Sequence, residues 1–84
     1  MTNNPEFEEG PFYLVVGTTI SQLGKNAIIW ATDENTACGV YGRKIGIRTY
    51  AYATLLGSLE DVKKQYKMSP NQLTDLHREG YLRL

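Results

Sequence analysis

The sequence has little of what holds many small domains together or carries out catalysis. Its 84 residues include one cysteine, Cys38, and one histidine, His77. A single cysteine excludes both an internal disulfide and a zinc site built from cysteines. Nine basic residues are balanced by nine acidic ones, so the chain lacks the net charge that would hold it on nucleic acid or on an anionic membrane.

Membrane and export signals are missing as well. No apolar run reaches the roughly 20 residues that a bilayer-spanning helix needs. The acidic first residues lack the basic and then apolar order of a signal peptide. These absences predict a cytoplasmic protein with no membrane partner.

Apolar residues, by contrast, suffice for one core. Hydrophobic residues make up 42% of the chain, which is typical of a small packed domain. Residues 1–11 differ from the rest, because they carry three glutamates and only Phe7 could anchor them. We therefore predict a flexible acidic tail, or a loosely docked one, over residues 1–11 and a single globular domain over residues 12–84.

The signals after residue 12 alternate between strand and helix. β-branched and aromatic residues favour strands over 12–19 and 26–31, and apolar spacings of three and four favour a helix over 33–45. Gly39 and Gly42 lie on adjacent turns of that helix, where missing side chains allow another backbone to approach closely. Two further helices follow over 58–79, and Ser58 and Ser69 are suited to cap them. Residues 47–56 alternate like a strand but also fit a helix.

The predicted architecture is therefore an α+β fold with the order ββαβαα. A small, mainly antiparallel sheet is packed by one helix and followed by a two-helix C-terminal segment. The sheet has about three strands, and residues 81–84 either add a short fourth strand or pack as a tail.

Catalytic and cofactor chemistry finds no support in the pattern. Asp75 lies two positions from His77, so on a helix their side chains point in different directions. Cys38 has no histidine near it in the sequence, and a small thiol suits a contact between helix and sheet. The acidic residues lack the ligand spacing of a calcium loop. We predict no catalytic residue, no metal site, no cofactor and no enzymatic activity.

The two C-terminal helices carry apolar residues at Val62, Tyr66, Met68, Leu73 and Leu76. These positions resemble the buried positions of a helix-turn-helix, a family whose second helix reads the DNA major groove. The resemblance implies that base edges are read by Asn71, Gln72, Thr74, His77 and Arg78. It implies that phosphates are contacted by Lys63, Lys64 and Lys67. Two helices packed on a sheet produce the same spacing.

A second candidate surface follows from residues 47–56. On a strand with one covered face, Arg48, Tyr50 and Tyr52 project together from the other face. Tyrosine and arginine are enriched at the energetic centres of protein–protein interfaces, and Arg43 and Lys44 add nearby positive charge. The pattern thus predicts a protein-binding surface. The alternative is that the tyrosines are core residues whose hydroxyls are hydrogen-bonded.

These observations favour a non-enzymatic binding protein that inhibits or regulates a larger protein by occupying its surface. Small phage-encoded inhibitors such as anti-CRISPR proteins work in this way, an analogy of size and architecture only. The alternative is a DNA-binding transcriptional regulator that uses segment 58–79. A third hypothesis is an oligomeric component, a homo-oligomer that pairs through exposed sheet edges.

Overall fold

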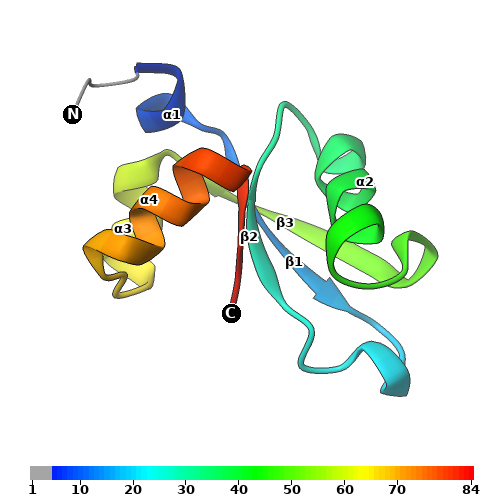
Figure 1. The fold of residues 1–84 in the computed structure, drawn as a ribbon. Coiled ribbons are helices and arrows are strands. Elements are labelled where there is room, and N and C mark those ends of the chain that lie inside the picture. The colour runs from blue at the N-terminus through cyan, green and yellow to red at the C-terminus, as the bar shows by residue number, and fades with distance from the viewer. Residues whose placement is uncertain (1–4) are drawn as a thin grey trace.

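A four-stranded sheet with the order β3-β1-β2-β4 runs through the middle of the molecule (Figure 1). The structure, a computed structural model, describes residues 5–84. All neighbouring strands are antiparallel, and the strands are β1 (Phe12–Gly17), β2 (Ala27–Trp30), β3 (Ala51–Gly57) and β4 (Tyr81–Arg83). The helices are α1 (Pro5–Glu9), α2 (Glu34–Lys44), α3 (Leu59–Gln65) and α4 (Pro70–Glu79), with short 3₁₀ turns η1 (Ile20–Gln22) and η2 (Arg48–Tyr50). The predicted α+β architecture is confirmed, and β4 supplies the short fourth strand.

One face of the sheet is covered by α2 (Figure 1). Its core joins Tyr13 and Val15 of β1 to Ile29 of β2 and to Ala37 and Tyr41 of α2. Tyr41 is fully buried, and its hydroxyl donates a 2.8 Å hydrogen bond to the carbonyl of Lys25. The bond removes the cost of burying a polar hydroxyl without a partner, so α2 is fixed to the sheet by both packing and a specific polar contact.

The other face of the sheet carries the second core, made with α1, α3 and α4. Phe12 and Ile28 point to this side and pack with Val62 of α3 and Leu76 of α4, all four fully buried. Successive residues of a strand point to opposite faces, so Phe12 and Tyr13 lie in different cores although they are neighbours in the chain. The alternation of β1 therefore builds both layers.

The starts of the helices agree with their capping signals. At the start of α2, the carboxylate of Asp33 accepts a 2.7 Å hydrogen bond from the backbone amide of Thr36. Ser58 and Ser69 each form a capping box in front of α3 and α4, with reciprocal bonds to Asp61 and Gln72. The backbone bond from Ser58 lowers the pKa of Asp61, with a smaller effect from the Ser58 hydroxyl. Such caps satisfy amide groups that the first helical turn leaves open.

The prediction of a strand over 47–56 is wrong for its first residues. Residues 48–50 form η2, and β3 begins at Ala51. The reason lies in α2, because Gly42 meets the backbone of Arg48. A β-carbon at Gly42 would lie 2.6 Å from the Arg48 β-carbon and 3.1 Å from its amide nitrogen. The close approach expected of both helix glycines thus occurs at Gly42, where it holds residues 48–50 against α2, and does not occur at Gly39, which meets only side-chain atoms at ordinary distance.

The N-terminal helix α1 packs on the second core through Phe7. Phe7 is buried, and its ring centre lies 5.3 Å from that of Phe12, 5.0 Å from Trp30 and 4.6 Å from His77. Residues 1–4 of the predicted tail lie outside the described residues, and the flexibility of the segment stays a prediction. In residues 5–84, no helix is long and apolar enough to cross a membrane.

We predict that Phe7→Ala lowers the free energy of unfolding by about 3 kcal/mol, because it empties the buried site of a ring that packs against Phe12 and Trp30. The matched control is Glu8→Ala in the same helix, where the side chain is exposed and the change should stay within about 0.5 kcal/mol. Urea unfolding followed by tryptophan fluorescence measures both. Equal stabilities of the two variants would show that α1 is not anchored through this ring.

Candidate functional site

β3 forms one of the two edges of the sheet. This strand pairs with β1 on one side, and within residues 5–84 no strand pairs with its other side. Two large apolar side chains on it are more than half exposed, Tyr52 at 62% and Leu55 at 59%. We call Ala51–Gly57 the β3 edge. It exposes both side-chain and backbone groups.

The register shows which backbone groups point outward. The amide of Thr18 donates to the Tyr50 carbonyl at 2.8 Å, in line with the register of β1 and β3. In an antiparallel pair, every second residue exchanges hydrogen bonds with its opposite partner. Tyr52 and Thr54 are therefore bonded to β1, and the N–H and C=O groups of Ala53 and Leu55 point away from the sheet.

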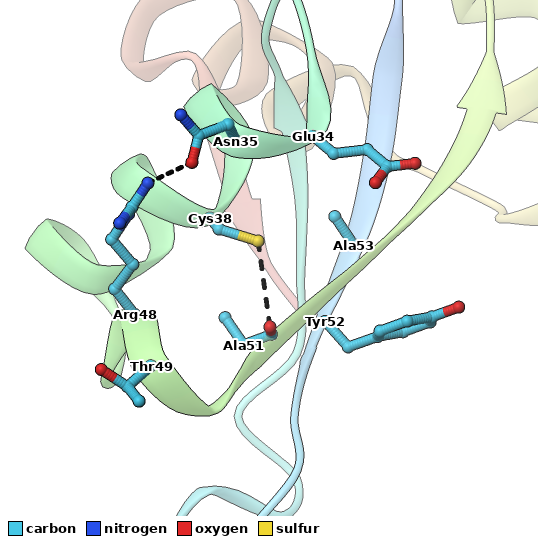
Figure 2. Close-up of a pocket in the computed structure, with 8 residues that line it drawn as sticks. All are labelled: Glu34, Asn35, Cys38, Arg48, Thr49, Ala51, Tyr52 and Ala53. Carbon is cyan, nitrogen blue, oxygen red and sulfur yellow. Dashed lines mark hydrogen bonds between the residues drawn. The ribbon is translucent and has the colours of Figure 1, made fainter.

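A hollow of about 390 Å³ lies between the β3 edge and α2 (Figure 2). The Arg48 guanidinium donates a hydrogen bond to the Asn35 amide oxygen at one end. The Cys38 sulfur lies 3.9 Å from the Ala51 carbonyl oxygen on the floor. Partial burial raises the pKa of the Cys38 thiol although the nearby Arg48 charge opposes the shift. A protonated thiol is a poor nucleophile.

A second hollow, of about 560 Å³, lies along α2 over its two glycines. A β-carbon at Gly39 would lie 3.7 Å from Arg43 Nη1 and 3.9 Å from Arg48 Nε. Two guanidinium groups therefore lie close to one another on this part of α2. Within residues 5–84, the ion pairs are those of Arg78 with Asp75 and Glu79, so Arg43 and Arg48 have no carboxylate within 4.0 Å.

The structure places all five residues of the predicted protein-binding surface at the exterior: Arg43, Lys44, Arg48, Tyr50 and Tyr52. It does not place Arg48, Tyr50 and Tyr52 on one strand face. Arg48 and Tyr50 belong to η2, whereas Tyr52 lies on β3 and faces away from α2, as Figure 2 shows for its ring. The expected common face is wrong because the strand starts at Ala51, four residues later than predicted. Their role in binding stays a prediction.

Most residues of the proposed DNA-reading helix already make contacts within the domain. The Gln72 side-chain oxygen accepts a 2.9 Å hydrogen bond from the Ser69 amide at the start of its own helix. The Thr74 hydroxyl donates a hydrogen bond to the Pro70 carbonyl at 2.9 Å. His77 lies against the Phe7 ring, and Arg78 pairs with Asp75 at 2.7 Å. Asn71, Lys63, Lys64 and Lys67 are exposed. A role of this helix in DNA binding is untested and stays a prediction.

Sequence reasoning missed Thr54 and Leu55 as surface residues of interest. Both lie on the β3 edge and are exposed. The available signal was the absence of charge and proline from residues 51–57, which distinguishes this strand from edges that resist pairing.

Within residues 5–84, no three histidine, cysteine or acidic side chains are grouped to hold a metal ion. Comparison with protein-family models, with curated proteins and with solved structures finds no match to this chain.

Substitution of Gly42 and of Gly39 in α2 tests how closely Arg48 packs against this helix. We predict that Gly42→Ala lowers the free energy of unfolding, because crowding of this kind costs about 1–3 kcal/mol and the close contact includes the Arg48 backbone. Gly39→Ala is the matched control in the same helix. It meets only ordinary contacts and should raise the free energy of unfolding by up to about 1 kcal/mol through helix propensity. Thermal unfolding measures the stability of both variants. A Gly42→Ala variant that is more stable than the unmodified chain would contradict the close contact between Gly42 and Arg48.

Proposed function

We propose that this chain is a non-enzymatic binding protein that inhibits or regulates a larger protein by occupying part of its surface. The observation that carries the proposal is a basic group with an adjacent tyrosine at the end of α2. We call Arg43, Lys44, Arg48 and Tyr50 the basic end. All four residues are exposed, and no carboxylate among residues 5–84 pairs with the three cations.

The charge distribution supports a protein partner with an acidic surface. The net charge is zero, yet three exposed cations lie together at the basic end. Such a local cluster of positive charge steers association and selects against partners of the wrong sign. Tyr50, 43% exposed, adds apolar contact area with a polar tip.

The test begins with capture of partners from the native host by the immobilised chain, with and without nuclease. We expect a protein that remains after nuclease treatment. Purified, it should bind the chain less tightly as salt rises, since exposed charges are screened. Loss of the captured protein on nuclease treatment would instead point to nucleic acid and contradict the proposal.

We predict that Tyr50→Ala and Arg43→Ala each weaken binding of that purified partner by at least about tenfold, as truncation of interface anchors does. The matched control is Lys63→Ala, an exposed cation on α3 at the other side of the sheet. Calorimetric titration measures the affinities, and thermal unfolding checks the fold. Unchanged affinity for both variants would exclude the basic end as the binding site.

A further inference from the structure

The two edges of the sheet differ in how well they resist pairing. The edge strand β4 has three residues and includes Arg83. The edge strand β3 has seven residues with no charge and no proline. Its one irregularity in register lies near its end, opposite Phe12 and Tyr13. Natural edge strands are usually shortened, charged or bulged to prevent association, and most of β3 lacks these features.

We propose that a second copy of this chain pairs with the β3 edge in antiparallel orientation, across a two-fold axis at Thr54. The two four-stranded sheets then join into one sheet of eight strands. This assembly goes beyond the proposed function, because the pairing uses the backbone groups of the β3 edge, whereas the proposed function uses the side chains of the basic end. Arg48 belongs to the basic end and also lines the hollow beside β3.

The outward backbone groups fix the register of this pairing. Only alternate residues of β3 have N–H and C=O groups that point outward, and in the middle of the strand these are Ala53 and Leu55. Centring the axis at Thr54 places Ala53 opposite Leu55 of the second copy, and Leu55 opposite its Ala53. Each such pair exchanges two hydrogen bonds, so both residues become bonded in both copies.

The side chains are compatible with the same register. Thr54 lies opposite Thr54 of the second copy, a cross-strand combination that stabilises sheets. Residues directly opposite one another point to the same face, so the second copy's Leu55 lies beside Ala53 on the α2 side. Ala53 lines the hollow between β3 and α2, and an apolar side chain can enter there.

A second copy fits this edge better than a charged partner does. The seven residues of β3 are uncharged in both copies, so pairing creates no like-charge contact within the strands. The hollow beside them is lined by one acidic residue, Glu34, and one basic residue, Arg48, which leaves no net charge. The partner surface must therefore be uncharged and extended, and β3 is itself such a strand.

Disulfide trapping tests the register directly. In a Cys38→Ala background, Thr54→Cys places two thiols on a pair without hydrogen bonds, whose Cα atoms lie about 4.5 Å apart, within disulfide range. We expect a covalent dimer under mild oxidation. The matched control is Tyr52→Cys in the same background. Its two copies are four residues apart along the strands, about 13 Å, and should remain mostly monomeric on non-reducing gels.

The association itself is measured by sedimentation equilibrium of the unmodified chain over a concentration series that reaches millimolar. We expect a monomer–dimer equilibrium that Leu55→Lys shifts to monomer at every concentration, because the charge would lie at the shared edge. Ile20→Lys is the control, at a side chain 91% exposed on η1, and should dimerise like the unmodified chain.

The outcomes separate this proposal from the proposed function. A monomer at all concentrations, or equal trapping of the Thr54→Cys and Tyr52→Cys variants, would overturn pairing at β3. Neither result affects capture of a protein partner through the basic end, which is tested by Tyr50→Ala. A dimer that survives Leu55→Lys would show that the copies meet at another surface and would also overturn the proposal.

Discussion

The structure depends on the alternating burial of β1. Phe12 faces α3 and α4, whereas Tyr13 and Val15 face α2, and all three are buried. The side chains of a strand covered on both faces have partners in two layers. β2 and β3 pair with its two sides. The helices are then required on opposite faces, and β3 and β4 are left at the edges.

The local parts of this fold could be predicted from the sequence because their causes are local. Asp33, Ser58 and Ser69 each precede a helix and accept an amide of its first turn. Those contacts span three residues and are visible in the residue types. The turn at Arg48 could not be predicted in this way. It depends on Gly42 of α2, and the alternating tyrosines that follow conceal it.

The candidate site was predictable in its residue types and not in its arrangement. Arg48 and Tyr52 are both exposed, as a surface role requires, but they point to different sides of β3. Which strand lies at an edge follows from strand order, a property of the whole chain. Leu55 thus looked like an ordinary strand residue, although the order β3-β1-β2-β4 exposes both its side chain and its backbone groups.

The difference between the two sheet edges also determines what kind of assembly β3 pairing produces. A two-fold axis uses β3 of both copies and leaves only the two β4 edges at the ends of the joined sheet. β4 is short, and beyond it the Leu84 amide already donates to the Asn26 carbonyl at 2.9 Å. Arg83 places a charge there in each copy. An interface in which both copies use the same strand is a closed two-fold interface. The short, charged β4 edges at the two ends disfavour pairing with a further copy. Pairing at β3 therefore stops at two copies rather than extending into a fibre.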